Sequence, residues 1–334
     1  MRKLVHFILT RRLEDVLAVG FTATLMGFLL ARRVFHTFQV TGHDFIFLLL
    51  PVGVLGLKSL FQMLLTPEED RRENLGLGNY LASFFRPLAG IFRDWCPFIL
   101  LSACYYSLYT DLMFKLNPHT ADALLARFDA ALLGDQPSFL LQQWMNPWAT
   151  DFFNLIYFSY VFSLPVVALW LYTCREKTVF RRVMMGYLTL MLLGIVSYLC
   201  LPAIGPATYF SDHYTHDLNG HALIRGVDYI MRNGHVAYDC FPSLHVGIPL
   251  LLCLYLRRYL PKLFVPGLLY VLTMGCGVIY LRYHYLADVL AAFVYAPAAY
   301  WLNDFLLSRW PGERIITAIP ANATNPVPPD AEPT

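Results

Sequence analysis

The 334-residue sequence has few charged residues and almost no net charge. Asp, Glu, Lys and Arg make up 14% of the chain, roughly half of their usual share in soluble domains, and the net charge is +2. So small a charge excludes a protein that binds nucleic acid through a general excess of Lys and Arg. The seven cysteines form no CxxC pair and fall mostly in apolar stretches, so the sequence predicts no disulfide framework.

Apolar residues, by contrast, make up 57% of the chain and aromatic residues 16%. They form continuous runs long enough to cross a bilayer as helices, which takes about 20 residues. Continuous runs argue against a transmembrane β-barrel, whose strands alternate. We therefore predict an all-α, polytopic membrane helix bundle with about eight transmembrane helices. The expected spans are 13–35, 44–66, 94–116, 152–174, 183–204, 243–259, 264–283 and 285–307.

The distribution of positive charge predicts the orientation. With eight spans, most of the 25 Lys and Arg residues fall on the side of the N-terminus, which places both termini in the cytoplasm. The first apolar run has the length of an anchor and not of a cleaved signal peptide. We expect a two-span N-terminal region with its cytoplasmic loop (1–93), a catalytic membrane domain (94–308) and a disordered cytoplasmic tail (309–334).

Two short motifs open the sixth and eighth spans. Residues 241–245 read Phe-Pro-Ser-Leu-His, and residues 284–288 read His-Tyr-Leu-Ala-Asp. Both motifs lie at the outer, non-cytoplasmic ends of their spans, as helix N-termini, and helix N-termini bind anions through unpaired N–H groups. Ser243 suits the N-cap position. The two helix starts are expected to hold a phosphate group at the membrane surface.

The residue types in these motifs suit phosphoryl transfer. His284 and Asp288 are four residues apart, so we predict that they share a helix face and that Asp288 accepts a hydrogen bond from one ring nitrogen. The other nitrogen of His284 could then attack, while His245 protonates the leaving oxygen. Such chemistry needs no metal ion and no cofactor. Arg282 is a candidate to bind phosphate oxygens, or else an interfacial arginine that reaches lipid head groups.

Other interpretations of these residues are possible. A histidine at the end of a span is usually an interfacial polar residue, although an unpaired Asp inside a span is costly. His213 and His216 have a spacing that suits zinc, but no helix is predicted around them. Tyr157 and Tyr160 are interpreted as packing or interfacial aromatics. A transporter or scramblase would scatter polar residues across the middle of several spans, whereas here they gather at one face.

Segment 119–146 holds Leu and Phe residues at helical spacing with charged residues between them. This pattern predicts an amphipathic helix, either lying in the outer membrane interface or capping the bundle.

Together the two motifs resemble the type 2 phosphatidic acid phosphatase superfamily, and within it the branch that contains fungal inositol phosphorylceramide synthase. Segment 128–134 is also similar to that branch, and the resemblance extends over about residues 94–307. It implies a six-helix catalytic core. It further implies His284 as a nucleophile that forms a phosphohistidine, with Asp288 as its orienting partner. His245 would be the acid and base, and Ser243 a phosphate contact.

The sequence departs from the wider superfamily in its basic residues. Asn79 stands where the upstream lysine is expected, and Val278 stands six residues before the nucleophilic histidine, where an arginine is expected. Arg86-Pro87 matches the upstream Arg-Pro pair but lies on the opposite side in the predicted topology. The inositol phosphorylceramide synthase branch lacks the second arginine as well. Arg282 therefore becomes the substitute candidate for binding the phosphate.

The expected protein is a metal-independent membrane enzyme that acts on a lipid phosphate or phosphodiester on the non-cytoplasmic (periplasmic or lumenal) side. The phosphoryl group would pass to a lipid alcohol, as in sphingolipid metabolism, or to water. A lipid phosphomonoesterase and a polyprenyl pyrophosphate phosphatase are the alternatives within the same chemistry.

Overall fold

The computed structural model describes most of the chain, and its regular elements are helices. The described residues are 8–31, 53–54, 57, 89–102, 104–105, 117–174, 177–221 and 238–311. The labelled elements are α2 (Leu13–Ala31), α7 (Asp122–Leu133), α8 (Pro137–Leu140), η1 (Leu141–Trp144), α9 (Pro147–Cys174), α10 (Lys177–Cys200), α11 (Pro206–Tyr209), η2 (Ser211–His213), α13 (Leu244–Tyr259), η3 (Pro261–Leu263), α14 (Phe264–Tyr280) and α15 (Leu286–Arg309). Within these ranges the only β-type pairing is an isolated bridge between Ala203 and Asp239.

Four of the described helices are long and apolar enough to cross a membrane, which fits an integral membrane protein. They span Pro147–Thr173, Lys177–Cys200, Pro261–Tyr280 and Leu286–Arg309. These helices correspond to the fourth, fifth, seventh and eighth predicted spans, with ends shifted by a few residues. The start of α9 lies five residues earlier than predicted, at Pro147, because proline is compatible with the first position of a helix.

The sixth predicted span is a short helix inside the bundle. α13 has 16 residues, which is about 24 Å of helix against about 30 Å of hydrocarbon in a bilayer. It packs against α9, α10, α14 and α15 and is buried along most of its length. Because protein surrounds α13, its length does not have to match the bilayer.

The remaining predicted spans are described in part or not at all. α2 covers residues Leu13–Ala31 of the first one. The second span, 44–66, lies outside the described residues except for 53–54 and 57, and the third is described only as far as residue 105. The predicted tail lies outside them beyond residue 311.

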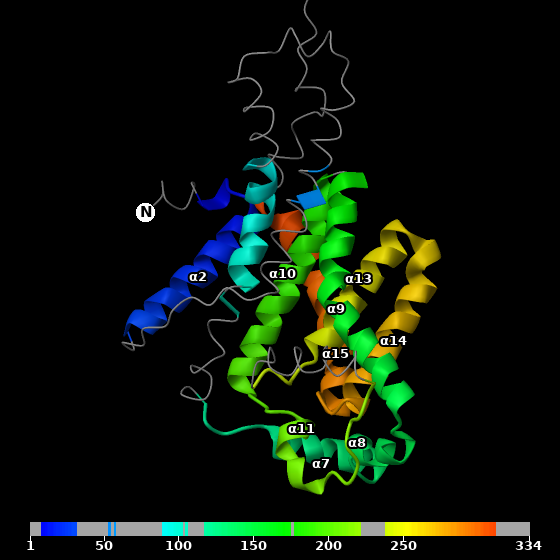
Figure 1. Ribbon diagram of the computed structural model, residues 1–334. Coiled ribbons are helices and arrows are strands. Elements are labelled where there is room, and N and C mark those ends of the chain that lie inside the picture. The colour runs from blue at the N-terminus through cyan, green and yellow to red at the C-terminus, as the bar shows by residue number, and fades with distance from the viewer. Residues whose placement is uncertain are drawn as a thin grey trace, which may run out of the picture.

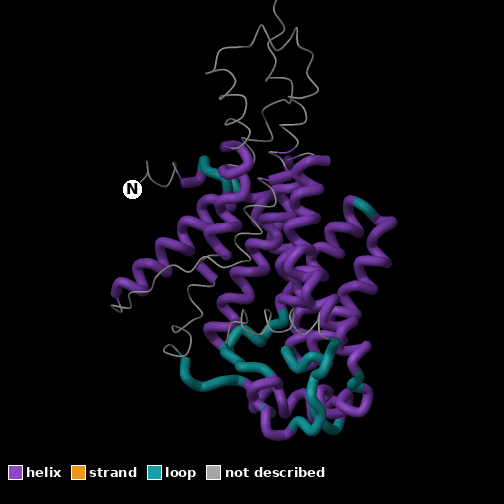
Figure 2. The backbone as a smooth tube through the Cα atoms, viewed as in Figure 1, coloured by secondary structure: helices purple, strands orange, loops and turns teal. Residues whose placement is uncertain are grey.

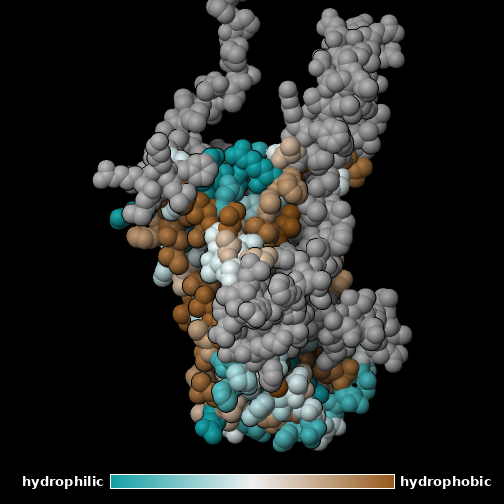
Figure 3. Space-filling view, turned by 90° about the vertical axis from the view of Figure 1, so that its left-hand side faces the viewer, coloured by the Kyte–Doolittle hydropathy of each residue, from teal (hydrophilic) through white to brown (hydrophobic). Residues whose placement is uncertain are grey.

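The long helices run side by side (Figure 1), and α10 and α13 are largely buried by their neighbours. α9, α14 and α15 expose most of their length, and their outward side chains include Val166, Leu269, Val294 and Trp301. On the face shown in Figure 3, the hydrophobic side chains of the described residues lie between two groups of hydrophilic side chains, one at each end of the bundle. This distribution is the one expected of helices that contact lipid.

One end of the bundle is covered by α7, α8, α11 and their loops (Figures 1 and 2). The predicted amphipathic helix of segment 119–146 forms as α7, but its buried face carries the carboxylates Asp122 and Asp129. Its exposed face carries Leu124, Phe128 and Leu132. α7 thus turns its two carboxylates Asp122 and Asp129 toward the protein, together with Leu125, and exposes Leu124, Phe128 and Leu132.

Candidate active site

The two predicted motifs meet at the end of the bundle that carries α7. His245 lies in the first turn of α13 and Asp288 in the first turn of α15, and both helices start at this end (Figure 1). His284 is two residues ahead of α15, in the turn that follows α14. The prediction that His284 and Asp288 share one helix is therefore wrong, because His284 precedes α15. His284 reaches Asp288 because the turn brings its ring back over the start of the helix.

Backbone hydrogen bonds fix this turn. The N–H of His284 donates to the carbonyl oxygen of Val278 at 3.2 Å, and Arg282 between them has a left-handed φ of 66°. Such a φ is uncommon for a residue other than glycine. The N–H of Ser243 donates to the carbonyl oxygen of Asp288 at 3.1 Å, which joins the start of α13 to the start of α15. The imidazole of His284 is thus held between the two helix starts.

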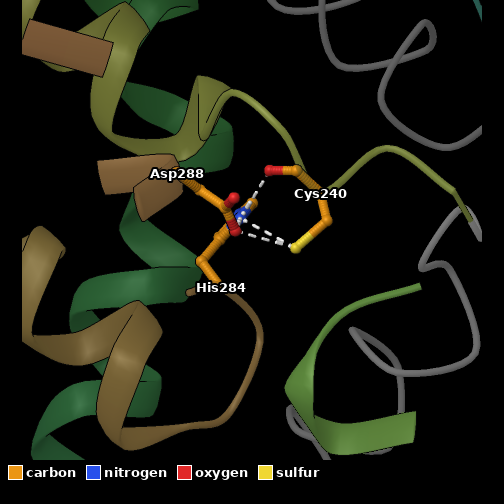
Figure 4. A group of neighbouring side chains, drawn as sticks. All are labelled: Cys240, His284 and Asp288. Atoms are coloured by element: carbon orange, nitrogen blue, oxygen red, sulfur yellow. Dashed lines mark hydrogen bonds and ion pairs between the residues drawn. The ribbon is translucent and has the colours of Figure 1, made fainter. Parts of the chain in front are cut away.

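The proton on His284 can be assigned from its neighbours (Figure 4). Its Nδ1 lies 2.9 Å from the carbonyl oxygen of Cys240 and 3.3 Å from Oδ2 of Asp288. A backbone carbonyl only accepts hydrogen bonds, so Nδ1 must carry the ring proton. In the neutral ring Nε2 then has a lone pair. The predicted contact between His284 and Asp288 is present, and both side chains are buried.

The thiol of Cys240 completes this cluster. Sγ donates to Oδ2 of Asp288 at 2.9 Å, and the N–H of Tyr285 donates to the same oxygen at 2.8 Å. Burial raises the pKa of the Cys240 thiol well above its ordinary value, and the Asp288 carboxylate adds to this shift. The sulfur therefore keeps its proton and acts as a donor.

Cys240, His284 and Asp288 could also be considered as metal ligands, since one ligand atom of each lies within 4.8 Å of the other two. A metal ion would need the lone pair of Nδ1, the ring atom that carries the proton here. Oδ2 of Asp288 accepts from the Cys240 thiol and faces Nδ1 of His284, while Oδ1 of Asp288 is buried without a hydrogen-bond partner within the described residues. Of the loop histidines considered for zinc, His213 stacks against Phe139 and His216 pairs through Nδ1 with Thr215.

His245 faces the unprotonated nitrogen of His284. Its Nδ1 is 3.0 Å from Nε2 of His284, and its Nε2 is 3.0 Å from the hydroxyl oxygen of Tyr157. Because Nε2 of His284 has the lone pair, Nδ1 of His245 must be the donor of that hydrogen bond. The two histidines therefore form a hydrogen-bonded pair, and Tyr157 extends it by one residue.

Ser243 offers a hydroxyl group at the start of α13. It occupies the N-cap position as predicted, but its side chain makes no capping hydrogen bond. The side chain is completely buried, and Oγ has no hydrogen-bond partner within the described residues. An unsatisfied buried hydroxyl is unfavourable and uncommon. Together with the N–H groups of the helix start, it could bind an anion such as a phosphate.

Arg282 points into the loop that follows α10. Its guanidinium lies over the ring of Tyr214, 3.8 Å from the centroid, and donates to the carbonyl oxygen of His216. It also contacts the sulfur of Met145 at 3.1 Å. The guanidinium of Arg282 is thus engaged with loop residues in this structure, and its binding to phosphate stays a prediction.

The buried carboxylates of α7 support the start of α15. Asp129 accepts hydrogen bonds from the N–H groups of Leu286 and Ala287 at 2.8 and 2.9 Å. These are backbone donors of the first helical turn, which no residue within the helix can satisfy. Burial raises the pKa of the Asp129 carboxyl, and the two backbone donors oppose this shift.

Asp122 supports the turn in front of α15. It accepts hydrogen bonds from the N–H groups of Ile204 and Gly205, both at 3.0 Å, and from the hydroxyl of Tyr285 at 2.9 Å. Gly205 has a φ of 82°, and a Cβ there would lie 2.9 Å from the carbonyl oxygen of Tyr283. Only glycine allows this close approach beside the candidate nucleophile.

Sequence reasoning did not assign a functional role to Cys240, Tyr157, Asp122 or Asp129. The two aspartates had a usable signal, because residues seven apart lie on one face of a helix, and carboxylates among leucines on one face need partners. Cys240 and Tyr157 had no such signal, since each joins the site through a contact between distant parts of the chain.

Comparison with known proteins identifies the family. A family model described as the PAP2 superfamily matches residues 123–302, which include both motifs, all of α13 and most of α15. The chain belongs to the PAP2 superfamily, whose members are phosphatases. Searches among curated proteins and among solved structures found no match.

Proposed function

We propose that the protein is a membrane enzyme that transfers the phosphoryl group of a lipid phosphate or phosphodiester through a phosphohistidine at His284. One observation carries the proposal: Nδ1 of His284 donates to a backbone carbonyl, so the lone pair of Nε2 faces the N–H of His245. A nucleophile with its proton on the far nitrogen, beside a possible acid, is the arrangement that nucleophilic catalysis requires.

In the first step, Nε2 of His284 attacks phosphorus and the bond from phosphorus to the leaving oxygen breaks. His245 begins this step as an imidazolium, and the proton on its Nδ1 moves to that oxygen, so the leaving group departs as a neutral alcohol and His245 becomes neutral. The attacked ring of His284 becomes positively charged, and the carboxylate of Asp288 stabilises it across the 3.3 Å contact. Oγ of Ser243 and the N–H groups of the α13 start bind the phosphoryl oxygens.

Substrate binding must separate the two histidines. Their nitrogens are 3.0 Å apart, whereas a bound substrate places both phosphorus and the leaving oxygen between them. The distance from the attacking nitrogen to phosphorus alone is about 3–3.5 Å in a reactive complex. The hydrogen bond between the histidines therefore belongs to the free enzyme.

In the second step, an acceptor hydroxyl gives its proton to Nδ1 of His245, and its oxygen attacks phosphorus. The bond between phosphorus and Nε2 of His284 breaks, which restores the starting state. With water as acceptor the enzyme is a phosphatase, and with a lipid alcohol it is a phosphotransferase. The resemblance of the motifs to the inositol phosphorylceramide synthase branch favours a lipid alcohol, and sphingolipid metabolism as the setting. A lipid phosphomonoesterase and a polyprenyl pyrophosphate phosphatase are the competing candidates.

The function can be tested on purified protein in detergent with a chelator present. Phosphatidic acid, polyprenyl pyrophosphate and phosphatidylinositol are supplied with and without ceramide or diacylglycerol. Release of inorganic phosphate indicates a phosphatase, and a new phospholipid that forms only with an acceptor indicates a phosphotransferase. His284→Ala should abolish either product.

The chain offers a matched control for that substitution. His221 also pairs with an aspartate, since its Nδ1 lies 2.5 Å from Oδ2 of Asp151 near the start of α9, but His221 is an exposed loop residue outside the two motifs. His221→Ala should keep wild-type activity. Product formation that survives in His284→Ala contradicts the proposal. Failure of every substrate to react favours a transporter or a non-catalytic role instead.

A further inference from the structure

We propose that Tyr157 is a positioning residue for the acid–base histidine: its hydroxyl holds Nε2 of His245 in both protonation states and so keeps Nδ1 directed at the leaving oxygen. The inference rests on the proposed function, because it assigns to Tyr157 a role in the chemistry of His245. It concerns a residue outside both motifs, on a different helix.

Tyr157 is firmly held in the middle of α9. Its side chain is 2% exposed, and its ring stacks on that of Tyr283 with 4.5 Å between centroids and 13° between planes. Its hydroxyl oxygen lies 3.0 Å from Nε2 of His245. Tyr283 immediately precedes His284 in the chain. The stack therefore joins the support of His245 to the turn that carries the proposed nucleophile.

The direction of the hydrogen bonds follows from the tautomer of His284. Nδ1 of His284 donates to the carbonyl of Cys240, so its Nε2 accepts and Nδ1 of His245 donates. When His245 is neutral, its Nε2 has the lone pair and the Tyr157 hydroxyl donates to it. The donor and acceptor capacities of the groups require this order, in which the Tyr157 hydroxyl donates to neutral His245.

The acid step requires a different form of His245. A histidine that gives up a proton from Nδ1 and ends as a neutral ring must begin as an imidazolium, with protons on both nitrogens. Nε2–H of the imidazolium then donates to the oxygen of Tyr157. A phenol can both donate and accept, so rotation of one O–H bond serves both states without moving the imidazole.

The surroundings of His245 also suit a cation. The ring centroids of Tyr157 and Tyr160 lie 4.8 and 4.7 Å from that of His245. Aromatic faces within about 6 Å attract a positive charge. The imidazole ring of His284 is the third ring beside His245, at 5.3 Å. Two tyrosine rings on α9 thus flank the side chain that must carry the proton.

This role predicts an effect that depends on the leaving group. An alkoxide leaves slowly unless it is protonated, whereas p-nitrophenolate leaves without an acid. Loss of the Tyr157 hydroxyl should therefore slow the first step for a lipid alcohol and leave it nearly unchanged for p-nitrophenol. A residue that only stabilises the fold would affect both substrates alike.

The test compares Tyr157→Phe with the wild-type protein on two substrates. These are the lipid phosphate that the wild-type enzyme turns over and the p-nitrophenyl ester of the same phosphoryl group. A hydrogen bond to a charged group is among the stronger ones, so release of the lipid alcohol in the first turnover should slow about 10- to 150-fold. The first-turnover release of p-nitrophenol should change less than about 3-fold, and KM should be unchanged for both.

Tyr270→Phe is the matched control. The hydroxyl of Tyr270 lies 2.8 Å from Oγ of Ser159, also on α9, so this substitution removes a comparable contact without touching a histidine. It should leave both rates unchanged. If Tyr157→Phe does not fold, 3,5-difluorotyrosine at position 157 keeps the ring and the hydroxyl but changes its acidity. That variant should change the first-turnover release of the lipid alcohol and leave the first-turnover release of p-nitrophenol unchanged.

Equal losses on the two substrates, or no loss on either, would overturn the inference about Tyr157. The proposed function fails separately: a wild-type protein whose turnover does not depend on His284 overturns both. Turnover that requires His284 but ignores the Tyr157 hydroxyl overturns only the role of Tyr157.

Discussion

Cys240 supports the proposed nucleophile through two different groups. Its carbonyl accepts from Nδ1 of His284, and its thiol donates to Oδ2 of Asp288. Cys240→Ala removes only the thiol, so the tautomer of His284 is kept while Asp288 loses one of its donors. A single hydrogen bond contributes about 0.5–1.5 kcal/mol, and we expect kcat to fall about 2- to 12-fold.

Cys240→Ser should recover most of this activity, because a hydroxyl can also donate to Asp288. Cys253→Ala provides the comparison for the loss of a buried sulfur, since Cys253 lies in α13 and contacts the carbonyl of Phe264. It should lower stability without lowering kcat. Steady-state kinetics on the three variants measure the effect, and an unchanged kcat in Cys240→Ala would show that the thiol is not needed to hold Asp288.

For Ser243 we expect a substitution to lower activity without lowering stability. Its Oγ is buried and has no partner within the described residues, so Ser243→Ala should leave the thermal unfolding midpoint equal or slightly higher. The same change removes a proposed contact to the phosphoryl group. We expect kcat/KM to fall about 5- to 30-fold, the equivalent of about 1–2 kcal/mol. A lower midpoint with unchanged kcat/KM would mean that the hydroxyl serves the fold and not the substrate.

At the scale of elements, α7 connects the surface of the protein to the start of α15. Asp129→Ala removes the acceptor for two backbone N–H groups of that start, and loss of such a cap costs about 0.5–2 kcal/mol. The thermal midpoint should fall and kcat should fall with it, because α15 carries Asp288. Asp129→Asn keeps one acceptor oxygen, so its thermal midpoint and kcat should lie between those of the wild-type protein and those of Asp129→Ala.

Asp135→Ala is the control for the loss of a carboxylate in the same region. Asp135 is exposed and accepts from the neighbouring N–H of Gln136. The Asp135→Ala substitution should change neither the thermal midpoint nor kcat. If Asp129→Ala behaves like Asp135→Ala, the start of α15 does not depend on α7.

The elements were more predictable from the sequence than the contacts between them. Long apolar runs predict α9, α10, α14 and α15, because a helix that crosses the hydrocarbon core needs about 20 apolar residues. The spacing of four residues predicts the contact between His284 and Asp288. The partners of these groups lie far away in the chain: 44 residues separate Cys240 from His284, and 88 separate Tyr157 from His245. No local pattern relates such residues, because the packing of the bundle creates the contact.

Arg282 shows that the direction of a side chain is also difficult to predict from the sequence. Its position two residues before His284 suggested a phosphate contact, but its direction depends on a left-handed turn and on Tyr214 in a distant loop. Spacing along the chain does not predict which way a side chain leaves such a turn.

At the scale of the whole molecule, a buried ion cluster joins α2 to the bundle at the end away from the site. The carboxylate of Glu14 is fully buried and accepts from Arg12 at 2.8 Å and from Arg181 at 2.7 Å. Arg12 also donates to Asp94 at 2.6 Å. Arg181 lies in the first turns of α10, whose other end leads to Gly205 and the candidate site.

Glu14→Gln should destabilise the protein strongly, because it leaves two guanidinium groups without their buried counter-charge. Breaking a buried pair in this way costs about 3–5 kcal/mol. The thermal midpoint in detergent should fall, while kcat at a permissive temperature stays near that of the wild type. A loss of kcat without a lower midpoint would contradict this account, because the cluster would then act on the site itself.

Asp304→Asn is the corresponding control at the same end. Asp304 pairs with Arg182 and Arg258, but its side chain is 31% exposed. Exposed pairs contribute about 0–1 kcal/mol, so the midpoint should change little.

In the proposed mechanism Nε2 of His284 carries the phosphoryl group between the two steps, and an experiment that traps the group on this atom tests the mechanism. His245→Ala removes the base of the second step, whereas p-nitrophenyl phosphate needs no acid in the first. The variant should therefore accumulate the intermediate. After a quench in base, which preserves phosphohistidine, mass spectrometry should find one phosphoryl group on the peptide that contains His284. Turnover of the wild-type protein with no phosphoryl group on the trapped variant, or with one on another residue, would contradict this mechanism.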